Sequence, residues 1–241
     1  MSQDSAGPAS TTGSPELAGA VVVDFPLRGE DWVAVNSPAD RVPSHGTDML
    51  GQRYAFDFIR VDGRPGLHAH PAGRWRGLLI GGRARECYAW GAPVHAPFDG
   101  EVVRAVDGVQ ERAWLHPVRE IAHALINAVT FTPARLPRIL GNHVVLRGDA
   151  GFAALVHFVP GSVAVDSGQA VRAGDLLGRV GHSGNSTMPH LHLQLMDSDD
   201  PMTARGIPCA FRTYEVRRDG AWAPVRAGIP GKADRIRAVP T

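Results

Sequence analysis

The sequence predicts a mainly β protein, an antiparallel β-sheet sandwich or open barrel with one inserted helical segment near 112–130. Its 241 residues include 28 glycines and 19 prolines, a composition that favours tight turns between short strands. Short apolar runs broken by Gly, Asp and Ser recur from "NHVVL" (142–146) to "HLHLQLM" (190–196). Apolar residues at helical spacing are clear only in "HPVREIAHALINAV" (116–129). Together these patterns favour sheet over helix.

The N-terminal half of the chain is divided by composition. Residues 1–16, rich in Ser, Thr, Gly, Pro and Ala, predict a disordered lead-in, and 17–241 predict one β-rich domain with insertions at 59–90 and 110–140. "RYAFDFIRV" (53–61) alternates as a strand should. Residues 91–108 read as strand, turn and strand, with Gly100 expected in the turn and Val102 expected in the core.

The second half adds the helix and a series of strands. Pro117 suits the first helical turn, and Val118, Ile121, Leu125 and Val129 recur at helical spacing. Residues 161–181 loosely resemble 91–108, which indicates a duplication. "FRTYEVRRDGAWAPV" (211–225) predicts a hairpin that turns at Asp219 and Gly220.

Charge, cysteine content and the N-terminal sequence argue against several classes of protein. With 25 basic and 24 acidic residues and no Lys-rich arm, nothing indicates nucleic-acid binding. Cys87 and Cys209 belong to no CxxC motif, so two buried free thiols are expected, with one disulfide as the alternative. The sequence shows no signal peptide and no apolar run of the ~18 residues that a transmembrane segment needs. On this evidence the expected location is cytoplasmic.

Two histidines stand one residue apart in "HLHLQLM". On a strand, His190 and His192 share one face with Gln194, and the intervening leucines share the face expected to be the core. On a helix the two histidines would point about 200° apart. Because imidazole is a common zinc ligand, the strand would let both reach one site. Incidental histidines on a half-exposed strand are the alternative.

Upstream residues could complete such a site. His45 lies in a loop, and Asp57 lies on the strand face opposite Phe56 and Phe58. A carboxylate in an apolar frame is costly to bury without a cation, which a metal would supply. A solvent-facing Asp57 is the alternative. Asp48 is nearer to His45 in sequence but has no apolar frame, so Asp57 is favoured.

A further candidate is His157, which interrupts the apolar run "AALVHFV" (153–159). A purely structural role is its alternative. The remaining histidines are expected to be ordinary loop, helix, strand or turn residues: His68, His70, His95, His116, His123, His143 and His182.

The pieces "SHGTD", "YAFDF", "GAPVHAPFDGEVV", "GNHVVL", "ALVHF" and "VRAGDLLGRVGHSGNSTMPHLHLQ" occur in this order. Together they resemble the lysostaphin-like zinc metallopeptidases, which are peptidoglycan and glycyl-glycine endopeptidases. The resemblance covers most of residues 42–197 outside the two insertions, and "GHSGNSTMPHLHLQ" is its most specific part.

The resemblance implies the antiparallel duplicated hybrid motif fold with one Zn²⁺ in a groove. Residue by residue, it implies that His45, Asp57 and His192 are the zinc ligands. It implies that His157 and His190 are catalytic histidines that do not bind the metal. Many members of the family have the first His and the Asp in an HxxxD motif, whereas His45 and Asp57 are twelve residues apart.

The implied function is a zinc metalloendopeptidase that hydrolyses peptide bonds in peptidoglycan stem peptides or cross-bridges. One alternative is a non-catalytic cell-wall-binding or regulatory member of the same fold. Another is a histidine phosphocarrier of related fold, which would need neither Asp57 nor the paired histidines. The expected partner is a peptide or peptidoglycan substrate, and the oligomeric state is not predicted. The family substrate would move the expected location to the cell envelope or outside the cell.

Overall fold

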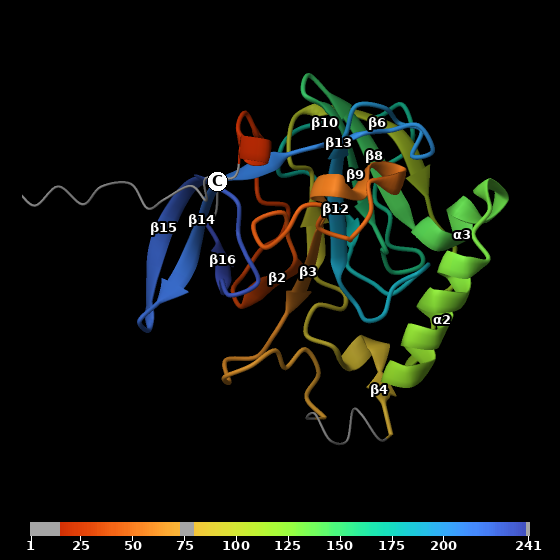
Figure 1. Ribbon diagram of the computed structural model, residues 1–241, viewed down its shortest axis with the longest axis horizontal. Helices are drawn as coiled ribbons and strands as arrows, with labels where there is room; N and C mark the ends of the chain where they lie inside the picture. Colours follow the sequence, from red (N-terminus) through yellow and green to blue (C-terminus); the bar gives the residue numbers. More distant parts are fainter. Residues whose placement is uncertain (1–14, 73–79, 240–241) are drawn as a thin grey trace, which may run out of the picture.

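A large mixed sheet forms the centre of the protein and confirms the mainly β prediction (Figure 1). The structure is a computed structural model that describes residues 15–72 and 80–239. Twelve strands pair in the order β1-β14-β16-β2-β3-β12-β9-β8-β6-β10, with β13 on β12 and β15 on β14. Their bounds are β1 Val21–Val23, β2 Trp32–Asn36, β3 Phe56–Arg60, β6 Gly100–Val106, β8 His143–Gly148, β9 Gly151–Val156, β10 Ala170–Val171, β12 Leu191–Met196, β13 Gly206–Ile207, β14 Cys209–Arg218, β15 Ala221–Gly228 and β16 Ile236–Ala238.

Two small sheets and six short helical segments complete the described fold. The small sheets pair β5 (Pro93–His95) with β11 (Leu176–Arg179), and β4 (Gly82–Arg83) with β7 (Trp114–Leu115). The α-helices are α2 (Pro117–Val129), which confirms the predicted helical segment, and α3 (Leu136–Leu140). The 3₁₀ turns are η1 Pro15–Leu17, η2 Met49–Tyr54, η3 Ala84–Glu86 and η4 Pro133–Arg135. Within the described residues, no helix combines the length and the apolar character needed to cross a membrane.

Alternation along β12 decides which face is buried in the core. Leu191, Leu193 and Leu195 lie in the main apolar cluster and have almost no exposed surface, as the pattern predicted. On β3, Phe56 and Phe58 join the same cluster. Asp57 and His192 therefore lie together on the opposite face.

Strand register brings polar residues into one row across that opposite face. Asp57 on β3 is paired with His192 on β12, and His192 is paired in turn with Val156 on β9. A register shift on β2 between Ala34 and Asn36 sets Asn36 opposite Asp57. The row runs through the middle of the large sheet, where neighbouring strands fix each backbone position.

The two segments with similar sequences pair with each other. β5 and β6 come from the first segment, β10 and β11 from the second, and the pairs are β5 with β11 and β6 with β10. Gly100 differs from the expectation, because it begins β6 and does not form the tip of the turn. A Cβ there would lie 2.3 Å from the carbonyl oxygen of Arg147, so close strand approach requires glycine.

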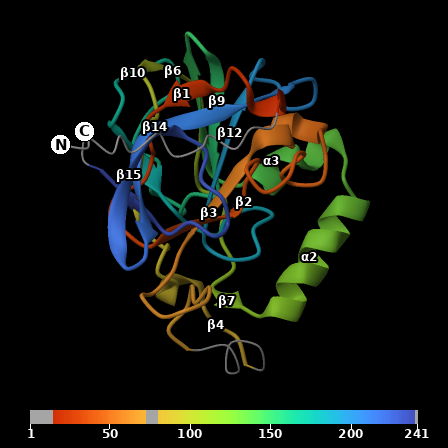
Figure 2. The same ribbon diagram turned by 60° about the vertical axis from the view of Figure 1, so that its left-hand side comes forward.

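The two predicted insertions meet at one end of the molecule. Gly82 and Arg83 from the first pair with Leu115 and Trp114 from the second, and α2 follows directly (Figures 1 and 2). The division into one domain with two insertions stays a prediction.

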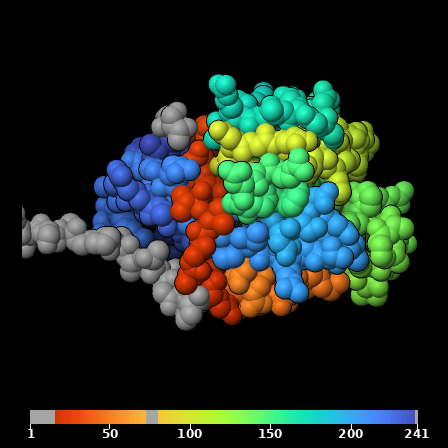
Figure 3. All heavy atoms as spheres, turned by 90° about the horizontal axis from the view of Figure 1, so that it is seen from above, coloured from red at the N-terminus to blue at the C-terminus, as the bar shows by residue number. Residues whose placement is uncertain are grey.

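Both ends of the described chain contribute to one edge of the sheet. β1 pairs in parallel with β14, and the red N-terminal segment lies between the dark-blue C-terminal strands and the green and light-blue strands in Figure 3. β14 and β15 form the predicted hairpin, whose turn residues Asp219 and Gly220 both have positive φ. Most of the predicted disordered lead-in, residues 1–14, lies outside the described residues, whereas Pro15 and Glu16 belong to η1.

Both cysteines are buried and free, as expected. Burial raises the thiol pKa of Cys87 and of Cys209 to about 12, so both stay protonated and unreactive at neutral pH.

Candidate metal centre

Asp57 lies at the centre of the site and is almost fully buried. Its Oδ2 accepts a hydrogen bond of 2.7 Å from Nδ2 of Asn36 and lies 3.0 Å from Nε2 of His45. Its Oδ1 lies 2.9 Å from Nδ1 of His192 and 3.3 Å from Nε2 of His190. Both carboxylate oxygens are therefore directed at histidines.

His45 lies in the loop after β2, and a neighbouring hydroxyl fixes which ring nitrogen faces Asp57. Ser44 Oγ donates to the carbonyl oxygen of Gln52 at 3.2 Å, so the Ser44 oxygen is free to accept from Nδ1 of His45 at 3.1 Å. A proton on Nδ1 leaves a lone pair on Nε2, the atom that faces Asp57.

His192 is fixed in the opposite tautomer by Gln194, two residues along β12. The Gln194 amide donates from Nε2 to the carbonyl oxygen of Leu50 at 2.7 Å, which identifies its Oε1 as an acceptor. That Oε1 lies 2.8 Å from Nε2 of His192, so Nε2 carries the proton and Nδ1 carries the lone pair. Nδ1 is the atom that faces Asp57.

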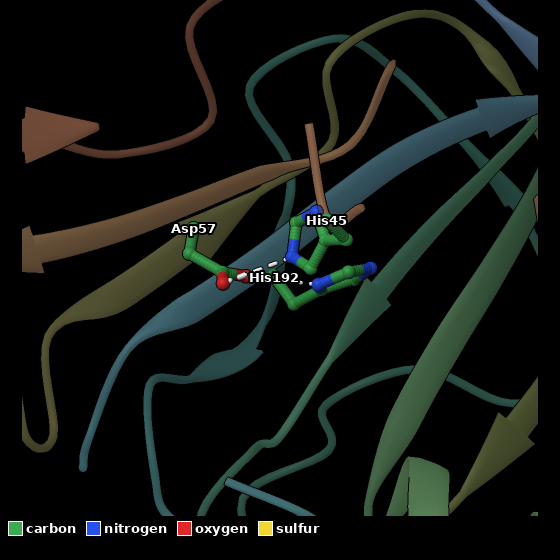
Figure 4. A group of neighbouring side chains, drawn as sticks. All are labelled: His45, Asp57 and His192. Carbon is green, nitrogen blue, oxygen red and sulfur yellow. Dashed lines mark hydrogen bonds and ion pairs between the residues drawn. The ribbon is translucent and has the colours of Figure 1, made fainter. Parts of the chain in front are cut away.

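With the ring protons on these outer nitrogens, three electron-pair donors converge. Nε2 of His45, a carboxylate oxygen of Asp57 and Nδ1 of His192 lie within 4.8 Å of one another, and Figure 4 shows the three side chains directed at a common point. Among the described residues this is the one such group that could hold a metal ion. Two histidines and one carboxylate match a zinc site that keeps a position open. The residues present therefore fit a zinc ion.

The electrostatics of Asp57 agree with a site built for positive charge. Burial alone would raise its pKa, but the facing imidazoles of His190 and His45 hold it well below the ordinary value. The carboxylate is therefore ionised at neutral pH.

His190 lies beside the three donors, just ahead of β12. Its Nδ1 donates to the carbonyl oxygen of Met188 at 2.7 Å and lies 3.1 Å from Oγ of Ser186. Its Nε2 therefore faces the site. Burial lowers the pKa of His190, but the carboxylate of Asp57 outweighs burial and raises it.

His157 follows β9 directly and has φ of 73°, a left-handed conformation that is uncommon for a residue with a side chain. Its Nδ1 donates to the carbonyl oxygen of Ser183 at 2.8 Å, which leaves Nε2 with the lone pair. The ring centroid lies 4.8 Å from that of His190 and 6.1 Å from that of His192. Burial, followed by the two neighbouring imidazoles, holds the pKa of His157 well below its ordinary value.

A buried polar network holds the turn that precedes His190. Arg112 donates to the carbonyl oxygens of Gly184 at 3.0 Å and Ser186 at 2.6 Å. Its Nε donates to Glu120 on α2 at 2.7 Å. Ser186 Oγ lies 3.0 Å from Nδ1 of His182, whose pKa is lowered to about 3 by burial and then by Arg112. The network links α2 to the backbone beside His190.

Sequence reasoning did not assign these supporting residues. Gln194 shares a strand face with His192, so its spacing alone could have identified it. Arg112 and Glu120 belong to the second insertion, and no motif marks them. Asn36 becomes visible only through the register shift on β2.

The acidic and histidine residues that the sequence did not favour for the site lie elsewhere. Asp48 is exposed and pairs with Arg53 at 2.5 Å. His70 is hydrogen-bonded to the chain near Arg83, and His123 lies on α2 near Asn127. None of these three side chains joins the group around Asp57.

Comparison with known proteins identifies the region around the site. Residues 87–204, about half of the chain, match the model of Peptidase family M23. This segment contains His157, His190 and His192, whereas His45 and Asp57 precede it.

Solved structures similar to this chain are distant. A Pseudomonas aeruginosa protein assigned to peptidase M23 is 17% identical, with 78% of this chain and 47% of that chain covered and a TM-score of 0.36. The lysostaphin catalytic domain of Staphylococcus simulans is 24% identical, with 52% and 79% covered and a TM-score of 0.32. A zinc-containing peptidase of Vibrio cholerae is 18% identical, with 77% and 39% covered and a TM-score of 0.32.

This chain spans less than half the length of the Pseudomonas and Vibrio proteins. The match over residues 87–204 agrees with the motifs in the sequence and with the mainly β fold. Residues 87–204 of this chain belong to peptidase family M23.

Proposed function

We propose that this protein is a zinc-dependent endopeptidase that hydrolyses peptide bonds in the stem peptides or cross-bridges of peptidoglycan. The observation that carries the proposal is the convergence of three electron-pair donors from His45, Asp57 and His192. Two of them are imidazole nitrogens whose partner nitrogens are already occupied by Ser44 and Gln194. Such outer hydrogen bonds are typical of histidines that bind metal.

His45, Asp57 and His192 would hold the zinc ion. When bound, zinc supplies a water of lowered pKa and polarises the scissile carbonyl. His157 and His190 contribute proton transfer, because each has one nitrogen fixed by a backbone carbonyl and presents Nε2. Together they supply a general base and a general acid for attack and for departure of the amine. The short separation of their rings, 4.8 Å, lets both act on one peptide bond.

A peptidoglycan substrate is proposed from family membership and from the motifs shared with glycyl-glycine endopeptidases. It places the site of action at the cell envelope or outside the cell. The two insertions pair through β4 and β7, and the second insertion carries α2. Arg112 links α2 to the turn before His190, so the insertions belong to the surroundings in which a substrate would be selected.

The test uses the purified full chain. Bound metal is measured by mass spectrometry, and the protein is incubated with peptidoglycan sacculi and with glycine-rich peptides. New amino termini are then identified in the products. His68→Ala serves as the matched control, because His68 belongs to a second HxH pair that lies in a loop.

Wild type and His68→Ala are expected to carry about one zinc per chain and to release the same peptides. A wild type with zinc but no cleavage product would instead assign the chain to the non-catalytic members of the fold. A wild type without zinc that accepts phosphate on a histidine from a carrier protein would support the phosphocarrier alternative.

Gln194→Leu tests the proposed tautomer of His192. Removing the acceptor for Nε2 lets the proton move to Nδ1, so zinc affinity should fall by about 10- to 100-fold. The measurement is zinc titration against a competing chelator, with the exposed Gln110→Leu as control. Equal zinc affinity in Gln194→Leu and wild type, with both folded by circular dichroism, would contradict this role.

Arg112→Ala tests whether Arg112 is a positioning residue for His190. Loss of its bonds to Gly184 and Ser186 should lower kcat by about 10- to 100-fold while KM and zinc content stay unchanged. Nitrogen-15 spectra of the histidine rings should show His190 losing its single Nδ1-protonated form. Arg147→Ala, which removes an exposed partner of Glu101, is the control. A lowered melting temperature with unchanged kcat and ring spectra would make Arg112 merely structural.

A further inference from the structure

Helix α2 exposes its apolar side and buries a polar residue, the reverse of an ordinary surface helix. Its exposed side carries five aliphatic side chains that are between 56% and 87% exposed: Val118, Ile121, Leu125, Ile126 and Val129. Its single buried residue is Glu120. A surface helix normally buries its apolar stripe and exposes its polar face. We call these five side chains the outer face of α2.

Polar contacts fix this orientation. The buried carboxylate of Glu120 accepts a hydrogen bond of 2.7 Å from Nε of Arg112. Nδ2 of Asn127 donates to Oδ1 of Asn185 at 2.8 Å. Rotating the helix to bury its aliphatic side chains would separate both pairs, and an unpaired buried carboxylate is costly. Figures 1 and 2 show α2 at the edge of the molecule, and none of the described elements lies on its outer side. The outer face is therefore available to a partner.

The exposed charges along the segment that carries this face have one sign. Over residues 112–148, all of them described, Glu120 is the single acidic residue, and it is buried and paired. Arg119, Arg135 and Arg138 are exposed, and Arg135 donates to Oγ1 of Thr130 at the end of α2. At the other end, Trp114 is partly exposed. An aliphatic stripe flanked by arginine and tryptophan is complementary to an anionic lipid surface.

We propose that the outer face of α2 docks the protein onto an anionic phospholipid surface, with the helix lying in the plane of the interface. The aliphatic side chains enter the boundary of the acyl chains, and the arginines reach the headgroup phosphates. A second copy fits less well, because two-fold pairing of α2 would bring Arg119 and Arg135 toward their equivalents with no carboxylate between them.

The first test is sedimentation of the full chain with lipid vesicles at physiological salt. Vesicles of phosphatidylcholine with phosphatidylglycerol are compared with vesicles of phosphatidylcholine alone. We expect binding to the anionic vesicles and much weaker binding to the neutral ones. The triple variant Ile121→Gln, Leu125→Gln and Val129→Gln should bind at least about tenfold more weakly. Leu176→Gln, on β11, removes an exposed aliphatic side chain elsewhere and should bind as wild type does.

The second test changes charge. The double variant Arg135→Gln and Arg138→Gln should lose several-fold in affinity for anionic vesicles, since each basic residue near the surface contributes to binding. Its matched control is Arg172→Gln with Arg226→Gln, two exposed arginines on other strands and loops. Equal loss in both double variants would show only an effect of net charge and would overturn the assigned surface.

Three further results would overturn the proposal. Wild type could stay in the supernatant with both vesicle types, or the triple variant could sediment as wild type does. Wild type could also elute as a dimer while the triple variant elutes as a monomer, which would make the outer face a self-association surface. Vesicle binding needs neither zinc nor cleavage, so these outcomes are independent of the proposed peptidase activity.

Discussion

His192→Ala is expected to abolish both zinc binding and peptide cleavage. Nδ1 of His192 is one of three converging donors, and the remaining His45 and Asp57 would leave too few ligands for tight binding. Cleavage should fall by at least about 10⁴-fold, because without metal the pKa of the attacking water is no longer lowered toward neutrality. The measurements are zinc content and the rate at which new amino termini appear.

The control for this variant is His68→Ala, which leaves the five site residues untouched. Because His192 lies in a buried row of the sheet, the melting temperature of the metal-free variant is also compared with that of the metal-free wild type. A folded His192→Ala protein that keeps one zinc per chain and cleaves at the wild-type rate would remove His192 from the site.

His190→Ala is expected to separate the two functions of the histidine pair. Zinc content should stay near one per chain, because His190 is not among the three converging donors. The value of kcat should fall by about 10²- to 10⁴-fold with little change in KM, as expected for loss of an acid or base. Single-turnover cleavage and zinc analysis on the same preparation check both parts.

His190→Ala and His192→Ala form a matched pair, since they change the same residue type at positions two apart, one just ahead of β12 and one within it. Loss of zinc in both variants would show that His190 also binds the metal. Retained zinc together with retained turnover in His190→Ala would leave proton transfer to His157 alone.

The faces of the central strands could be predicted because alternation is a local property. The leucines of "HLHLQLM" and the aromatic residues of "YAFDF" each define a core face, and the histidines and Asp57 follow on the other. The hairpin at Asp219 and Gly220 was predictable for the same reason, since its turn chemistry is contained in two residues.

What could not be predicted depends on contacts between distant segments. The bond between Asn36 and Asp57 follows from a register shift, which no short motif reveals. The contact of Arg112 with the turn before His190 joins residues more than 70 positions apart. Helical spacing predicted α2, but its apolar stripe faces outward because buried Glu120 fixes the opposite side.

The hydrogen bonds that fix each imidazole were also beyond sequence reasoning. Ser44, Gln194, Met188 and Ser183 supply the partners of the four site histidines, two of them through backbone carbonyls that carry no sequence signal. Because each partner binds one ring nitrogen, it leaves the other nitrogen of that histidine facing the site.

The proposed zinc site is tested most directly by anomalous X-ray scattering at the zinc edge from crystals of the zinc-loaded protein. If these side chains hold zinc, one strong peak will lie about 2.0–2.2 Å from Nε2 of His45, a carboxylate oxygen of Asp57 and Nδ1 of His192. No peak among these three side chains, or a peak bound by the opposite ring nitrogens, would contradict the proposed site.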